Sequence, residues 1–190
     1  MNKLLFILFP FFSFSQQIFD SQIIYNNDDL FDQTIVRDLN INFYEIDYDD
    51  FLVQSWFDNT KLRQPASFLM EDITFDSVAV RYKGNSTFYI PWSVNNPKLP
   101  FNIDINKYDD NQNVFGYGKI KLANSLFDPT MRKEILGYSV YRQYLPAPQA
   151  NYINLTVNND LLGLYVNTES VNLEFLDKHF NENDGVFFKC

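Results

Sequence analysis

Hydrophobic and polar residues alternate in several short segments of the chain, and this two-residue period predicts β-strands. The alternating segments span residues 35–43, 73–82, 98–106, 119–124, 150–158 and 161–168. The tight turn at 158–160 (Asn-Asn-Asp) joins the last two, so they are expected to form a hairpin. Residues 83–87 (KGNST) follow the strand at 73–82 and indicate a turn-rich loop.

Three other segments have the features of helices. Residues 47–57 open with acidic side chains, which favour a helix N-terminus. Asp128 followed by Pro129 is a typical helix start, and this helix is expected to run to about Tyr144. A third helix is expected at 171–180, and the polar segment 58–65 is expected to be a loop. A further strand begins at 186–189, where the chain ends in mid-run.

The order of these elements predicts the fold class. After the glycine loop come two strands, a helix, a hairpin and another helix, which is the order of a protein-kinase N-terminal lobe. The sequence therefore predicts an α+β fold, with a kinase-like N-terminal lobe built on an antiparallel five-stranded sheet, an inserted helix and an incomplete C-lobe. Order alone says little about function.

The first 15 residues have the pattern of a secretory signal peptide. Lys3 is followed by the apolar run at 4–12 and by small residues at 13–15. This run is shorter than the roughly 20 residues that span a bilayer, so no stable membrane insertion is expected after cleavage. We predict three parts: the signal peptide at 1–15, a strand and helix extension at 16–72, and the kinase-like region at 73–190. The predicted location is outside the cell or on its surface.

Composition narrows the classes of function. The net charge is −9, from 15 basic and 24 acidic residues, which disfavours nucleic-acid binding because phosphate backbones repel such a surface. The 20 Phe and 12 Tyr residues favour sheet structure. Cys190 is the single cysteine, so an intrachain disulfide or a zinc cluster is excluded. His179, the single histidine, is expected at a solvated helix end rather than in a catalytic site.

Five motifs occur in a consistent order between about residues 75 and 189. They are RYKGNST at 81–87, PK at 97–98, LAN at 122–124 with DPTMRKE at 128–134, LPAP at 145–148, and VNN at 157–159 with LGLY at 162–165 and Glu169. Together they resemble the N-terminal part of the CotH kinase family. Two positions depart from that family's pattern: Leu99 stands where a second lysine is frequent, and Asn159 where glycine is usual.

The resemblance implies a secreted, ATP-dependent kinase that phosphorylates Ser or Thr of exported or surface proteins, with ATP and Mg²⁺ as cofactors. In the family, the catalytic aspartate and the metal ligands follow the region matched here. We therefore expect the chain to be truncated and inactive alone, with no catalytic or metal-binding residue of its own. The alternative is a non-catalytic surface or spore-coat-like module that serves structure or assembly, and acidic motifs downstream in the gene would favour the enzyme.

The candidate nucleotide-binding residues fall into two groups. Gly84, Asn85 and Ser86 form a loop whose backbone N–H groups and hydroxyl can approach a phosphate, although an ordinary hairpin turn has the same sequence features. Glu169 ends a stretch that would join the two lobes of a kinase, where the backbone meets the adenine ring; a simple strand end is the alternative.

Glu134 is the most informative acidic residue. It lies at helical spacing on a mostly apolar stripe, where a carboxylate is costly unless it meets a cation. Kinases pair such a glutamate with a lysine that orients the nucleotide phosphates. Lys121 is the first candidate for this lysine, Lys119 lies on the same predicted strand face, and Lys98 is the third candidate. Alternatively, Glu134 reaches the helix edge beside Lys133 or Arg142.

Overall fold

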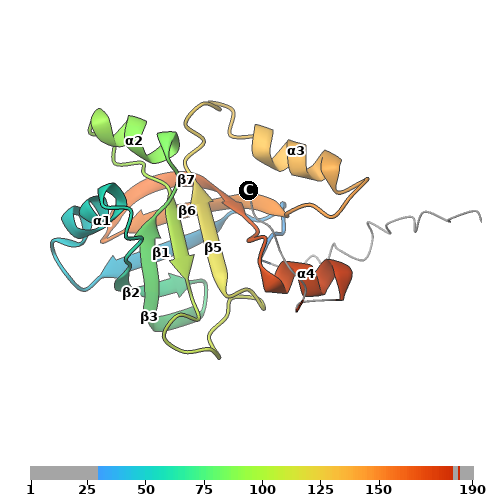
Figure 1. Ribbon diagram of the computed structural model, residues 1–190, viewed down its shortest axis with the longest axis horizontal. Helices are drawn as coiled ribbons and strands as arrows, with labels where there is room; N and C mark the ends of the chain where they lie inside the picture. Colours follow the sequence, from blue (N-terminus) through green and yellow to red (C-terminus); the bar gives the residue numbers. More distant parts are fainter. Residues whose placement is uncertain (1–29, 182–183, 185–190) are drawn as a thin grey trace, which may run out of the picture.

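The computed structural model describes residues 30–181 and residue 184. In this part of the chain, seven strands form a closed barrel with four helices around it (Figure 1). The strands are β1 (Arg37–Phe43), β2 (Gln64–Met70), β3 (Ile73–Tyr82), β4 (Phe101–Asp104), β5 (Lys119–Ala123), β6 (Ala150–Val157) and β7 (Asp160–Thr168).

The interior of the barrel is filled by alternate residues of the strands. In β1, for example, Leu39, Ile41 and Phe43 are buried while their neighbours are more exposed. The same alternation in the other strands brings aliphatic and aromatic side chains into one core cluster. Tyr165 is fully buried there, and its hydroxyl donates a hydrogen bond to the Leu99 carbonyl at 3.0 Å. This pattern explains why the two-residue period predicts the strands well.

The sheet runs in the order β1-β2-β3-β4-β5-β7-β6 and closes where β1 pairs with β6. All neighbouring pairs are antiparallel except β1 and β6, which run parallel with Leu39 opposite Leu155. The closure gives every strand a neighbour on both sides, although β5 and β7 pair only at Leu122 with Asn167 and at Ala123 with Val166.

The predicted fold class is therefore wrong. The protein forms a closed seven-stranded barrel rather than an α+β kinase-like lobe with an open, antiparallel five-stranded sheet. Two additional strands cause the difference. Residues 58–65 were expected to be a loop because the segment is polar, and no strand was predicted between it and residue 73. Residues 64–70 instead form β2, which pairs with both β1 and β3. The strand expected at 35–43 then closes the barrel against β6.

The helices lie outside the barrel (Figure 1). Helix α1 (Tyr48–Phe57) connects β1 to β2, and α2 (Ser86–Ser93) connects β3 to β4. Helix α3 (Lys133–Tyr141) packs on the outer face of β6 and β7 through Ile135, and α4 (Leu173–Phe180) follows β7. Helix α2 was not predicted, since its sequence carries Pro91 and lacks a helical period.

Helix α3 begins later than Asp128, where the sequence predicts its start. Asp128 instead organises the preceding turn: its carboxylate accepts hydrogen bonds from the Thr130 hydroxyl at 2.6 Å and from the Lys133 backbone N–H at 2.7 Å. The aspartate thus satisfies backbone donors at the helix start from several residues away. The Thr130 hydroxyl and these backbone donors lower the pKa of Asp128.

The predicted signal peptide at 1–15 and the strand start at 186–189 lie outside the described residues. None of the helices in the described part is long and apolar enough to cross a membrane. The predicted division at residue 72 falls in the connection between β2 and β3, two strands that pair with each other. It stays a prediction, and an experiment for it is given in the Discussion.

Candidate functional site

A pocket of about 400 Å³ lies on the outside of the barrel, where the ends of β3 and β5 meet the start of α3. Its lining combines cations, carboxylates and an amide with apolar surface. The residues are Lys83, Thr87, Pro100, Ala123, Asn124, Ser125, Leu126, Phe127, Asp128, Lys133 and Glu134. Most of them belong to the motifs RYKGNST, LAN and DPTMRKE, so the fold brings three separate motifs to one place.

Glu134 is held in this pocket by the neighbouring strand. The Thr168 hydroxyl, at the end of β7, donates a hydrogen bond to the Glu134 carboxylate at 2.6 Å. Glu134 is half-buried, so its orientation is restrained both by this bond and by the packing of α3 on the barrel. A fixed carboxylate of this kind is suited to positioning a nearby cation.

Lys83 supplies that cation. It follows β3 directly, and its backbone N–H donates to the Pro100 carbonyl at 3.0 Å, which extends the pairing of β3 with β4. Burial lowers the pKa of Lys83; the Glu134 charge opposes this shift and the Arg81 charge adds to it. Lys83 and Glu134 do not form an ion pair within 4 Å, so the lysine lies near the glutamate without being neutralised by direct contact.

The glycine loop leads into α2 rather than into a hairpin. Gly84 has φ of +82°, a left-handed conformation that favours glycine, and an added Cβ would lie 2.1 Å from the Thr87 hydroxyl oxygen. Asn85 is the N-cap of α2 without a side-chain capping bond, and Ser86 is the first helical residue. Asn85 and Ser86 are both exposed, so their backbone and side chains are accessible to a ligand.

The three lysines considered from the sequence lie at different places. Lys121 lies on the outer face of β5, one position before Leu122. Because Leu122 pairs with Asn167 of β7, Lys121 lies near Thr168, which contacts Glu134. Lys119 forms an ion pair with Asp104 at 3.5 Å. The Lys98 ammonium lies 5.3 Å from the centre of the Tyr165 ring, and burial lowers its pKa. None of the three lines the pocket around Glu134.

Asn124 connects the pocket to the strands. Its amide nitrogen donates to the carbonyls of Thr87 at 2.9 Å and of Lys98 at 2.8 Å. Its amide oxygen is buried and has no hydrogen-bond partner among the residues that the structure describes. A buried acceptor without a partner is costly, so a donor that reaches this oxygen relieves that cost.

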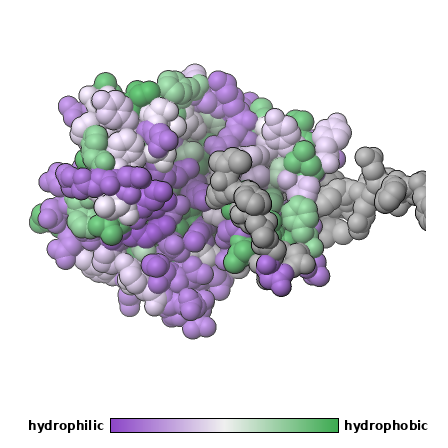
Figure 2. Space-filling view, in the orientation of Figure 1, coloured by the Kyte–Doolittle hydropathy of each residue, from purple (hydrophilic) through white to green (hydrophobic). Residues whose placement is uncertain are grey.

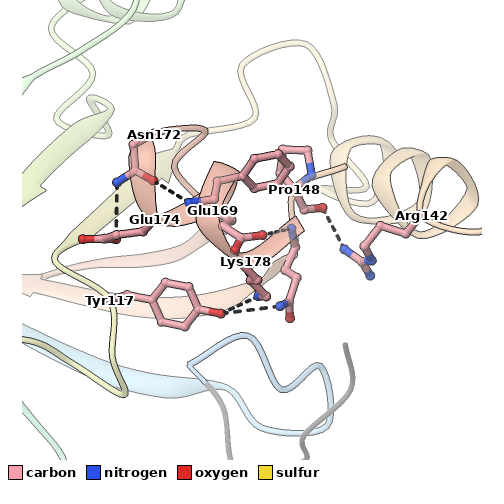
Figure 3. A network of polar contacts seen from close by, with 9 residues as sticks. Tyr117, Arg142, Pro148, Glu169, Asn172, Glu174 and Lys178 are labelled. Carbon is pink, nitrogen blue, oxygen red and sulfur yellow. Dashed lines mark hydrogen bonds and ion pairs between the residues drawn. The ribbon is translucent and has the colours of Figure 1, made fainter. Parts of the chain in front are cut away.

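Glu169 belongs to a separate network of polar contacts, whose residues do not line the pocket (Figure 3). Its buried carboxylate accepts a hydrogen bond from the Gln149 backbone N–H at 2.9 Å and forms an ion pair with Lys178 of α4 at 3.2 Å. Lys178 also donates to the Tyr117 hydroxyl at 2.9 Å. This network ties α4 to the end of β7, so the observed contacts of Glu169 are structural ones and none of them involves Glu134 or Lys83.

We predict that Lys178→Met destabilises the protein by about 1–3 kcal/mol. The substitution leaves the Glu169 carboxylate buried with one backbone donor, and Lys178 itself is partly exposed. The value therefore lies between the roughly 0–1 kcal/mol of an exposed ion pair and the roughly 3–5 kcal/mol of a buried one. Urea denaturation measures the change. Lys107→Met, at an exposed position, is the control, and equal stability of the two variants would contradict the assigned role.

The pocket residues fit part of the ligand that the sequence implies. Lys83 and Lys133 supply positive charge for phosphates, and the free Asn124 oxygen can accept from a hydroxyl or amino group. The pocket residues fit Mg²⁺ less well than they fit phosphate. No cluster of three or more His, Cys, Asp or Glu residues suited to a metal occurs among the residues that the structure describes.

Lys83 was not among the candidate lysines, although its motif was recognised. It stands in a segment that the sequence presents as a loop, and only the bond to the Pro100 carbonyl shows that the strand pairing continues to it. The period of β3 contains the missing signal: Arg81 and Lys83 are both polar, two residues apart, and therefore lie on the same face. Thr168 had no distinguishing sequence feature.

Comparison with known proteins agrees with the motifs. The model of the family described as CotH kinase protein matches residues 80–190, which is more than half of the chain. No curated protein matches the sequence. The matched region contains Lys83, the glycine loop, Asn124, Glu134 and Thr168. The chain therefore belongs to the CotH kinase family.

Proposed function

We propose that the chain provides the ATP-binding part of an exported CotH-like protein kinase. The observation that carries this proposal is the pocket shared by Lys83 and Glu134 within the family-matched region. Phosphoryl transfer depends mainly on positioning and on charge stabilisation of the phosphates. A lysine held near, but not paired with, a fixed glutamate meets the first of these needs.

In this proposal each pocket residue has a separate task. Lys83 binds nucleotide phosphate oxygens, Glu134 orients Lys83, and Thr168 orients Glu134 through its 2.6 Å hydrogen bond. The Asn124 amide oxygen accepts from the base or the ribose. ATP supplies the phosphoryl group, and an exported or surface protein supplies the acceptor Ser or Thr hydroxyl. Saturable ATP binding by the chain from residue 16 onward tests the proposal; absence of binding would favour a non-catalytic assembly role.

Export is the second part of the proposal. It is supported by the basic, apolar and small-residue order of residues 1–15. Mass spectrometry of protein secreted by the native host is expected to find a mature N-terminus near Gln16. Replacing Leu5 and Leu8 by Asp is expected to block export, because the apolar run is then interrupted. Intact Met1 on the secreted protein, or export that survives both substitutions, would contradict this part.

A further inference from the structure

A second pocket, of about 650 Å³, lies between α1 and the end of β3. Its twelve lining residues include no Asp or Glu, in a chain with 24 acidic residues, whereas Lys61, Arg81 and Lys83 bring three positive charges. The remaining lining residues are uncharged, and they include polar, aromatic and aliphatic side chains: Leu52, Ser55, Trp56, Phe57, Asn59, Leu62, Tyr82, Gly84 and Asn85. Hydrophilic residues dominate the surface around α1 in Figure 2, and paler, more hydrophobic ones lie over α2.

None of the three cations forms an ion pair within 4 Å in the described part of the protein, although the Asp104 charge acts on Arg81 and the Glu134 charge on Lys83. The ion pairs there join Arg37 to Glu71, Arg63 and Lys119 to Asp104, and Lys178 to Glu169. Arg81 and Lys83 are half-buried, and burial lowers the pKa of each. Partly buried charges without a directly paired carboxylate are unfavourable, and an anion that enters the pocket relieves this cost.

The walls of the pocket are held in place by hydrogen bonds. The Trp56 indole donates to the Gly84 carbonyl at 2.8 Å, which joins α1 to the glycine loop. Lys61 stands between two residues that are bound to Ser55: the Thr60 N–H donates to the Ser55 carbonyl at 3.1 Å, and the Leu62 N–H to its hydroxyl at 2.7 Å. The backbone that carries Lys61 is therefore positioned before any ligand arrives.

We propose that this pocket is an anion-binding site for a phosphate-type group of a small molecule, held by Lys61, Arg81 and Lys83. Arginine and lysine together suit such a group, because guanidinium binds oxyanions bidentately and ammonium acts as a point charge. The residues at 52–62 precede the family-matched region. The site is distinct from the pocket of Glu134, shares only Lys83 with it, and does not depend on the kinase proposal.

Calorimetric titration of inorganic pyrophosphate into the chain from residue 16 onward tests the site. Lys61→Gln and Arg81→Gln are each expected to weaken binding by about tenfold or more, the loss typical of a charge-assisted contact. Lys107→Gln changes the net charge equally at an exposed position outside the pocket and is expected to leave binding unchanged.

The proposal is overturned if pyrophosphate does not bind, or if Lys107→Gln weakens binding as much as Lys61→Gln, because binding then follows net charge alone. If Glu134→Gln loses pyrophosphate binding while Lys61→Gln and Arg81→Gln retain it, the anion binds in the other pocket and the proposal is overturned as well. Lys61 is exposed, so its variant stays folded even if Arg81→Gln does not. Competition by free phosphoserine supports the site and identifies a molecule that can carry the phosphate.

Discussion

A chain that begins at residue 73 is expected not to fold, although it contains the whole family-matched region. It lacks β1, α1 and β2, which leaves β3 and β6 as open edges. It also loses the interior side chains Leu39, Ile41, Phe43, Phe68 and Met70. At about 1.5–3 kcal/mol each, these five contribute roughly 8–15 kcal/mol. That sum is comparable to the whole stability of a typical domain, about 5–15 kcal/mol.

Circular dichroism melting curves of the chains from residue 73 and from residue 16 measure this effect. The longer chain is expected to melt cooperatively and the shorter one to show no transition. A matched pair of substitutions tests the contribution of β1 within the longer chain. Ile41→Asp places a charge in the core and is expected to lower the melting temperature, whereas Asn42→Asp changes an exposed neighbour and is the control. Cooperative melting of the chain from residue 73 would show that the domain division at 72 is correct and that the barrel can open.

Lys83→Met is expected to weaken ATP binding by at least about tenfold. The substitution keeps most of the side-chain volume but removes the charge that lies near Glu134 in the pocket. Charge-assisted contacts to phosphate justify a loss of this size. Thr168→Val is expected to cause a smaller loss, because it removes only the hydroxyl that orients Glu134. Binding of a fluorescent ATP analogue, at matched concentrations of folded protein, provides the comparison.

Two other lysines make this comparison decisive. Lys121→Met tests the lysine favoured by the order of elements in the sequence, and Lys98→Met tests the one that follows the glycine loop. Both are expected to bind ATP nearly as well as the unmodified chain, because neither lysine lines the pocket. If Lys121→Met loses binding and Lys83→Met retains it, the earlier choice of Lys121 is right and the task assigned to Lys83 is wrong.

The affinity of the wild-type chain for ATP is expected to fall as the pH rises. This fall is expected at a lower pH than a lysine with an ordinary pKa would give, because the pKa of Lys83 is lowered. Above that pKa the side chain is neutral and no longer attracts phosphate. Lys83→Met is expected to lack this part of the pH dependence.

Local patterns in the sequence were sufficient to predict most strands. The segment 73–82 matches the bounds of β3, and the predicted hairpin corresponds to β6 and β7. Closure of the barrel was not predictable in this way. It depends on the parallel pairing of β1 with β6, whose partners Leu39 and Leu155 are far apart in the sequence. Alternation shows that a strand has an inner face but not which strand lies beside it.

The site was predictable to a similar degree. A carboxylate on an apolar helical stripe indicated Glu134, since that position needs a polar partner. Its observed partner, Thr168, lies 34 residues away on β7, and no local spacing connects the two. Lys83 was passed over because residues 83–87, directly after β3, were interpreted as a loop. Residues that act together across strands are identified only once the register of those strands is known.

The most direct test of the account is a titration of ATP with Mg²⁺ into the ¹⁵N-labelled chain from residue 16 onward, followed residue by residue by NMR. We predict saturable shifts at the backbone amides of Lys83, Gly84, Asn124 and Glu134, and loss of those shifts in Lys83→Met. Absence of saturable shifts, or shifts confined to residues outside the pocket that joins β3, β5 and α3, would contradict the proposal that this barrel binds ATP beside Glu134.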